Sequence, residues 1–192
     1  MSLAGGSDKR LSDVLALRNP LILGSGPLGR NAKGLIKQSR HAGAVVGKSI
    51  TWLPRKGNPH PRVVSLGDYG LINWENLPNI GYEAFALELR KAKGRCACPV
   101  IASLGPSSDL DQLKTIAMAF EAAGADALEL DFKWGFDPAT GTTGYDTTAG
   151  GGAFGQDSIT RVVSALKEKV SIPLIAKPVS YTHLTLPTIL LV

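Results

Sequence analysis

The sequence predicts an α/β fold built on a parallel sheet, and two features of the chain carry this prediction. Short apolar runs of strand length alternate with longer segments in which apolar residues recur at helical spacing. The short runs carry apolar residues on both faces, so both faces of each strand have to be buried, which is typical of a parallel sheet covered by helices. The expected strands are 20–26, 44–51, 99–104, 126–132 and 173–177.

Helices are expected between the strands, and two of them carry clear end signals. The helix after the first strand has Asn31 at its N-cap position and Gly43 as its terminator. The helix after the third strand opens with Ser108 and Asp111 at the spacing of a capping box. The expected helices are 31–43, 81–93, 108–124 and 157–170.

Composition indicates a globular protein of the reducing cytoplasm. The 192 residues are 44% hydrophobic and 19% charged, and no apolar run approaches the roughly 20 residues of a membrane span. The net charge of +5 does not indicate nucleic-acid binding, because aromatic residues are few and are not interleaved with basic ones. Cys96 and Cys98 provide no disulfide framework, and no histidine forms a spaced pair with another metal ligand. We therefore expect no metal, no nucleic acid and no membrane partner.

The two ends of the chain are expected to lie outside the folded domain. Residues 1–10 lack the apolar core of a signal peptide and are expected to be disordered. The stretch VSYTHLTLPT at 179–188 resembles one reading frame of the adapter used in transposon-based sequencing libraries. We therefore expect residues 178–192 to be a non-native tail and the domain to span 11–177, with a genuine hydrophobic terminus as the alternative.

A polar residue stands at the C-terminal end of every expected strand. The carboxyl ends of parallel strands meet at one edge of the sheet, and the long expected loops 52–80 and 133–156 also begin there. A lysine in an apolar strand is costly unless its ammonium meets an anion or strong acceptors. Two such lysines favour one shared polar ligand, and independent ion pairs are the alternative. The strand-end residues are Ser25, Lys48, Ser103, Asp131 and Lys177.

A glycine pattern after the first strand offers a competing interpretation. Gly24, Gly26 and Gly29 spell G-x-G-x-x-G between a strand and a helix, which is the dinucleotide-binding fingerprint. The fingerprint also needs an acidic residue about 20 positions later, and no Asp or Glu lies between Gly29 and Asp68. Pro27 also lies inside the turn. A Rossmann-type nicotinamide dehydrogenase is therefore disfavoured.

Several blocks of sequence resemble one enzyme family, in the same order along the chain. They include GKSITWLPRKGNPHPR at 47–62, CPVIASLG at 98–105 and AGADALELDF at 123–132. The chain resembles the flavin-binding barrel of the dihydroorotate dehydrogenases, and the pyrimidine domain of dihydropyrimidine dehydrogenase is similar. The resemblance implies a (β/α)8 TIM barrel with FMN at its C-terminal mouth, truncated here after about five strands. An open barrel leaves strand edges unpaired, so we expect this length of chain to be inactive by itself.

The resemblance also implies roles for the strand-end residues. Lys48 would reach the flavin ring near the substrate, and Lys177 would lie against the pyrimidine edge of the flavin, where an ammonium stabilises negative charge. The implied substrate-binding residues are Lys48, Asn73 and Asp131. The implied cofactor-binding residues are Gly24, Ser25, Lys48, Ser49, Ser103 and Lys177.

The substrate side of the fourth strand departs from the family pattern. Where the family has Glu-Leu-Asn-x-Ser-Cys-Pro-Asn, this chain has ELDFKWGF, so Asp131 replaces the first Asn and Trp134 stands at the Cys. The family Cys removes a proton from the substrate, and an indole cannot act as a base. Lys133 is the candidate catalytic base, and Asp131, Asp137 and Tyr145 are the alternatives.

The resemblance implies an FMN-dependent oxidoreductase that moves a hydride between flavin N5 and a flat cyclic substrate. Oxidation of dihydroorotate to orotate is the family default, and a homodimer or an electron-transfer subunit is the implied protein partner. A second hypothesis is a barrel that binds FMN and lacks proton-abstraction chemistry.

Overall fold

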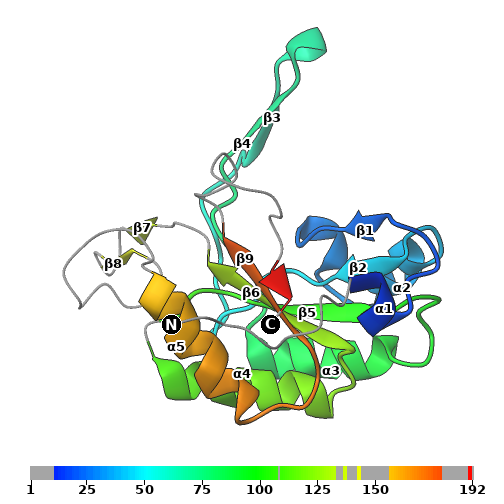
Figure 1. The fold of residues 1–192 in the computed structure, drawn as a ribbon. Helices are drawn as coiled ribbons and strands as arrows, with labels where there is room; N and C mark the ends of the chain where they lie inside the picture. Colours follow the sequence, from blue (N-terminus) through cyan, green and yellow to red (C-terminus); the bar gives the residue numbers. More distant parts are fainter. Residues whose placement is uncertain are drawn as a thin grey trace.

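The computed structural model describes residues 11–107, 109–132, 136–137, 142–143, 156–178 and 190–191. A curled sheet of five parallel strands forms its centre, and these strands lie side by side in chain order (Figure 1). A short further strand, from the segment expected to be a tail, pairs antiparallel with the last of them. The strands of this sheet are β1 (Ile22–Leu23), β2 (Ala44–Val46), β5 (Val100–Leu104), β6 (Ala127–Phe132), β9 (Leu174–Pro178) and β10 (Leu190–Leu191).

The strand order separates the two fold classes considered from the sequence. In the order β1-β2-β5-β6-β9 every neighbour in the sheet is also the next parallel strand in the chain. A doubly wound nucleotide-binding sheet instead reverses direction at a switch point, because its strands are added on both sides of the first one. Sequential addition with a consistent curl is the construction of a (β/α) barrel. The sheet is therefore part of a (β/α)8-type barrel, and the glycine pattern after β1 does not mark a Rossmann fold.

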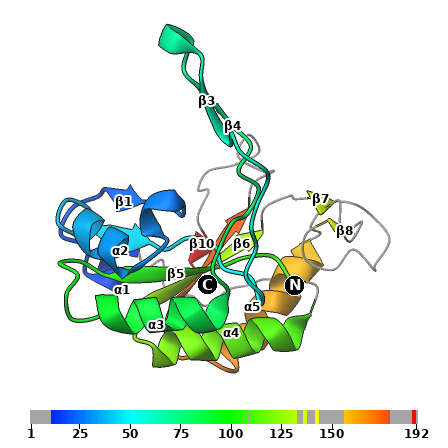
Figure 2. The ribbon, with the colours of Figure 1, turned by 180° about the vertical axis from the view of Figure 1, so that it is seen from behind.

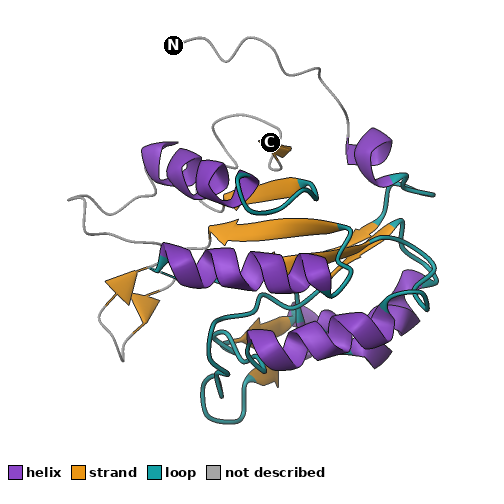
Figure 3. Ribbon diagram, turned by 90° about the horizontal axis from the view of Figure 1, so that it is seen from below, coloured by secondary structure: helices purple, strands orange, loops and turns teal. Residues whose placement is uncertain are grey.

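The helices form a layer along one side of the sheet. Each of α2, α3, α4 and α5 contacts the next one in this series, as the helices in the outer ring of a barrel do. The view from below shows them lying alongside the strands (Figure 3). The helices and short 3-10 turns are α1 (Leu11–Leu15), η1 (Pro27–Gly29), α2 (Ala32–Ser39), η2 (Gly67–Tyr69), α3 (Tyr82–Ala92), α4 (Leu110–Ala122) and α5 (Gln156–Lys167).

The helix ends confirm one expected cap and correct two others. Asn31 is the N-cap of α2, and its side chain accepts a 2.9 Å hydrogen bond from the Gly34 amide. Gly43 does not end that helix, which stops at Ser39; a side chain at Gly43 would instead collide with the carbonyl oxygen of Asn19. The expected capping box at the start of α4 is wrong, because Asp109 is the N-cap there.

The two faces of the sheet have different character, as the period of two in a strand requires. Alternate strand residues pack against the helices in a large apolar core that includes the edge-to-face pair Phe85 and Phe120. The opposite, inner face is apolar only toward the N-terminal ends of the strands, where α1 contributes Leu11 and Leu15. The inner apolar residues on the strands are Ile22, Ala44, Val46, Ile101, Ala127 and Ile175.

A hairpin projects from the sheet within the segment 52–80 that was expected to be a loop (Figure 2). Its strands β3 (Val63–Ser65) and β4 (Leu71–Asn73) pair antiparallel, and every residue in them is exposed. Within the second long expected loop, β7 (Phe136–Asp137) and β8 (Thr142–Thr143) pair antiparallel. Both long connections leave the sheet at the carboxyl ends of strands.

Candidate functional site

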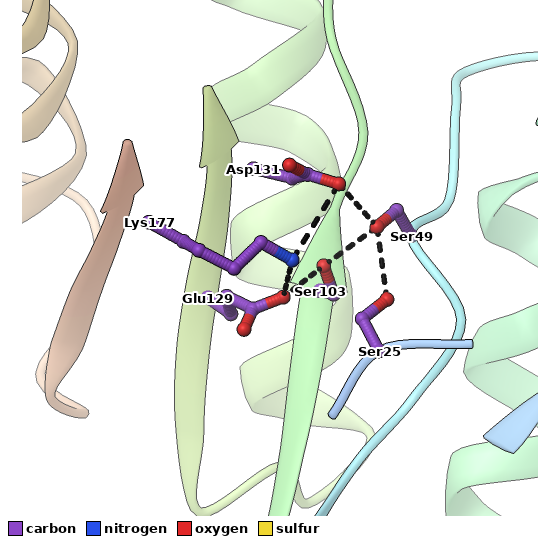
Figure 4. Close-up of polar contacts among 6 residues, drawn as sticks. All are labelled: Ser25, Ser49, Ser103, Glu129, Asp131 and Lys177. Carbon is purple, nitrogen blue, oxygen red and sulfur yellow. Dashed lines mark hydrogen bonds and ion pairs between the residues drawn. The ribbon is translucent and has the colours of Figure 1, made fainter. Parts of the chain in front are cut away.

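A cluster of polar side chains occupies the inner face of the sheet at the carboxyl ends of the strands (Figure 4). Ser103, Glu129, Asp131 and Lys177 lie two or four residues beyond the apolar inner positions of their strands, so the period of two turns them inward as well. The sheet register places Ser103 beside Glu129 and Asp131 beside Lys177. The strand-end cluster consists of Ser25, Ser49, Ser103, Glu129, Asp131 and Lys177.

Lys177 pairs with two carboxylates of the neighbouring strand. Its Nζ donates to Glu129 Oε1 at 2.7 Å and lies 3.6 Å from Asp131 Oδ2. Glu129 and Asp131 are buried, with 7% and 5% of their surfaces exposed, whereas the Lys177 side chain is 30% exposed. The ammonium therefore neutralises buried acidic groups, and the side chain that carries it keeps part of its surface exposed.

Ser49 connects the first two strands to this acidic pair. Its Oγ donates to Asp131 Oδ2 at 2.7 Å and lies 2.9 Å from Ser25 Oγ and 3.0 Å from Ser103 Oγ. A hydroxyl has one proton to donate, and Ser49 gives its proton to Asp131, so Ser25 is the donor in the bond between the two serines. Ser103 directs its own proton to Glu129 Oε1 at 2.8 Å. Both carboxylates are thus held by hydroxyl donors.

One polar atom of the cluster stands out because its hydrogen-bonding capacity is unused. Asp131 Oδ1 is buried and has no hydrogen-bond partner within the described part of the chain. A buried acceptor without a donor is unfavourable, since the water that it gave up on burial has not been replaced. An N–H or O–H donor brought to this oxygen would satisfy it.

The structure brings together five residues that the sequence analysis singled out and leaves two others apart. The five residues are Ser25, Ser49, Ser103, Asp131 and Lys177. Lys48 is buried next to Ser49 in the chain, and it borders a hollow that Arg30, Arg55 and Asn79 also line. Asn73 lies in the exposed strand β4 of the projecting hairpin. The expected convergence of Lys48 and Asn73 on the strand-end ligand stays a prediction.

The remaining predicted residues belong to the end of β1 and to the connection after β6. Gly24 follows β1, is exposed, and has no atom within 4 Å of the position that a Cβ would take, so the backbone there borders open space. Lys133, Trp134 and Tyr145 lie outside the described residues, and for Asp137 only the backbone in β7 is described.

Two functional candidates were missed from the sequence. Glu129 lies two residues before Asp131 in the same strand, so the period of two could have placed it on the inner face. Asn79 fixes the base of the hairpin: its Oδ1 accepts from the amides of Thr51 and Gly81, and its Nδ2 donates to Thr51 Oγ1 at 2.9 Å. Asn79 is the last residue of the block N-x-x-x-L-P-N at 73–79, which is part of the family resemblance, but no role of its own followed from the sequence.

The described ranges contain neither a membrane span nor a metal-binding cluster. No helix there is long and apolar enough to cross a bilayer. No group of three or more His, Cys, Asp or Glu side chains in those ranges is arranged to hold a metal ion. The two cysteines lie ahead of β5, and burial raises the pKa of both the Cys96 and the Cys98 thiol.

The chain matches known proteins in sequence and in structure. Residues 13–133 match the family model described as dihydroorotate dehydrogenase. The catalytic subunit of dihydroorotate dehydrogenase B (NAD(+)) from Methanosarcina acetivorans is 35% identical over 167 residues, which cover 85% of this chain and 50% of that protein. The corresponding subunit from Pyrococcus abyssi is 38% identical over 168 residues, with the same coverage of 85% and 50%.

A solved structure shares the fold. Dihydroorotate dehydrogenase from Eimeria tenella, in complex with ferulenol, superimposes with a TM-score of 0.57 at 21% identity, covering 79% of this chain and 40% of that one. The chain spans about half the length of the curated relatives it matches. On the sequence match over 13–133, the chain belongs to the dihydroorotate dehydrogenase family.

Proposed function

We propose that this protein is an FMN-dependent dehydrogenase that acts on a CH–CH bond of a flat cyclic substrate, with dihydroorotate as the family default. The observation that carries the proposal is the cluster of polar strand ends on one inner face, with the Lys177 ammonium among them. Membership of the dihydroorotate dehydrogenase family supports the same reaction class.

The residues present fit FMN as the cofactor. Gly24 borders open space, Ser25 presents lone pairs because its proton is directed to Ser49, and Lys177 offers an accessible ammonium. Bound FMN would supply the acceptor for the hydride that leaves the substrate. Lys177 would hold the electron-rich edge of the ring, and Ser25, Ser49 and Ser103 would complete the polar wall around it.

Substrate binding and proton removal are assigned to residues near the same strand ends. Lys48, Asn73 and Asp131 are the proposed substrate-binding residues, with the hairpin that carries Asn73 anchored by Asn79. Lys133, two residues after Asp131 in the sequence, is the proposed base.

We also propose a protein partner that receives the electrons. The similar archaeal proteins are named as catalytic subunits of dihydroorotate dehydrogenase B (NAD(+)), a name that implies a second subunit. The alternative partner is a second copy of the same chain.

The test is a spectroscopic titration of the longest form of the protein that its gene encodes. The purified protein should carry the absorbance bands of an oxidised flavin, and anaerobic addition of a cyclic dihydropyrimidine should bleach them. A protein that holds flavin but is bleached by no dihydropyrimidine would favour the second hypothesis, an FMN-binding barrel without proton-abstraction chemistry. That hypothesis draws its support from Trp134, which stands where the family has its Cys.

A further inference from the structure

We propose that Asp131 selects a neutral ring that offers an N–H group and disfavours a ring that carries a carboxylate. The inference rests on the proposed function, since it assumes that a flat ring binds at the strand-end cluster. Beyond the proposed function, it names the chemical class of that ring and assigns its selection to Asp131.

Asp131 has one carboxylate oxygen without a hydrogen-bond donor among the described residues. Only 5% of Asp131 is exposed, and Oδ2 is held by the Ser49 hydroxyl at 2.7 Å, which fixes the orientation of the carboxylate. Oδ1 has no hydrogen-bond partner among the described residues. An ionised carboxylate can only accept hydrogen bonds, so the group that satisfies Oδ1 has to be a donor. Ring N–H groups next to carbonyls, as in a cyclic imide, are donors of this kind.

The charges of the strand-end cluster also disfavour an anionic ring. Within the strand-end cluster two carboxylates, Glu129 and Asp131, share the single ammonium of Lys177. That ammonium lies at 2.7 Å from Glu129 and at 3.6 Å from Asp131, so Asp131 is the less neutralised of the two. A carboxylate on the ligand would add a third negative charge beside it. Like charges brought together in a partly desolvated site are strongly unfavourable.

The three serine hydroxyls of the cluster offer no spare proton to an anionic ligand, and Lys177, the one cation of the cluster, already pairs with both carboxylates. Ser49 and Ser103 donate their hydroxyl protons to Asp131 and Glu129. Ser25 donates its proton to Ser49. The three hydroxyls therefore face a ligand as acceptors, which again favours a ring with N–H groups over a ring with a carboxylate.

The N–H group could come from the substrate or from the pyrimidine ring of the flavin, because both rings have the same imide chemistry. The experiment therefore measures ring binding and flavin binding separately. Isothermal titration calorimetry on the longest natural form of the protein compares uracil, its carboxylated counterpart orotate, and 1,3-dimethyluracil, which has no N–H. These three probes require no turnover and no substitution in the protein.

We expect uracil to bind at least about ten-fold more tightly than orotate, as the addition of one unfavourable charge contact requires. Dimethyluracil should bind at least about ten-fold more weakly than uracil, because it leaves Asp131 Oδ1 without a donor. In Asp131→Asn the ratio of uracil to orotate affinity should fall by about ten-fold or more, and in the exposed control Asp111→Asn it should not change.

Orotate binding as tightly as uracil, or dimethyluracil binding as tightly as uracil, would overturn the inference with the wild-type protein alone. If Asp131→Asn weakens FMN binding and leaves the uracil-to-orotate ratio unchanged, the donor is the flavin and substrate selection by Asp131 is overturned. A protein that holds flavin and prefers orotate contradicts this inference only. A protein that takes up no flavin yet discriminates the three rings as expected contradicts the proposed function and supports the selectivity of Asp131.

Discussion

Ser49 Oγ donates a 2.7 Å hydrogen bond to Asp131 Oδ2 across 82 positions of the chain. The two residues come from segments after β2 and within β6, which are separated in the sheet by β5. The two side chains meet because the inner face of the sheet becomes polar at the carboxyl ends of neighbouring strands. The presence of this hydrogen bond therefore tests directly whether the side chains at the strand ends converge.

Replacing Ser49 with Ala should destabilise the protein by about 1–3 kcal/mol, since Asp131 would lose its hydroxyl donor while it stays buried. The free energy of unfolding, measured by urea denaturation, checks this value. Ser65→Ala in the exposed hairpin is the matched control and should change stability little. Equal stability of the two variants would mean that the Ser49–Asp131 bond contributes nothing.

The pairing of Lys177 with Glu129 predicts a coupled pair of substitutions. Removing one partner of a buried ion pair costs about 3–5 kcal/mol, and the cost should be lower here because the Lys177 side chain is 30% exposed. Lys177→Met alone and Glu129→Gln alone should each destabilise the protein. The double variant should lose less stability than the sum of the two, because neither charge is then left uncompensated. Strict additivity in the urea experiment would contradict direct pairing.

The ends of the expected strands predict four residues of this cluster and miss Glu129. Ser25, Ser103, Asp131 and Lys177 were predicted because parallel strands end at one edge, and they meet there. Glu129 was missed because only the last polar residue of each strand was considered. The direction of the Lys48 side chain could not be predicted, because it depends on the backbone path after β2, where the regular strand has ended.

The fold was likewise predicted in part from the sequence. The five strands and four long helices are found close to their expected places, because burial on both faces leaves a strong apolar pattern. The β3–β4 hairpin was read as a loop because its apolar residues, Val63 and Leu71 among them, are exposed and follow no core pattern. The cap of α4 was displaced by one residue because Ser108 and Asp109 are both good N-cap residues, and a pattern alone does not choose between them.

Glu121 predicts a pH-dependent contribution to stability. Its Oε1 accepts a 2.6 Å bond from the Ser171 hydroxyl and a 2.8 Å bond from the Ser171 amide, joining α4 to the segment before β9. The Ser171 hydroxyl lowers the pKa of Glu121 below the ordinary value of 4.5, with backbone amides adding to the effect and partial burial opposing it. A carboxyl whose pKa is lowered by folding stabilises the protein above its unfolded pKa, and this is lost as the pH falls through the folded pKa.

Glu121→Gln should therefore be less stable than the unmodified protein at pH 7, and the difference should shrink as the pH falls below about 4.5. Urea midpoints measured from pH 7 to pH 3 test this, with the exposed Glu168→Gln as the control. A difference that stays constant with pH would show that the charge of Glu121 has no part in the contact.

The two cysteines should be slow to react in the folded protein. Burial raises the pKa of Cys96 and of Cys98, so less thiolate is present at pH 7 than in a free cysteine. The rate of reaction with a thiol-specific disulfide reagent should be lower than that of free cysteine and should rise on unfolding in guanidinium. Fast labelling of both thiols in the native state would contradict their partial burial.

Flavin binding by the longest natural form of the protein tests most directly whether the strand ends surround a common flat ring. FMN is titrated into the apoprotein and followed by its fluorescence, and Lys177→Met is compared with Lys91→Met. The Lys91 side chain is 62% exposed and pairs with Glu88 within α3. We predict stoichiometric FMN binding that Lys177→Met weakens by about ten-fold or more and that Lys91→Met leaves unchanged. Equal affinity of the two variants for FMN would contradict the account.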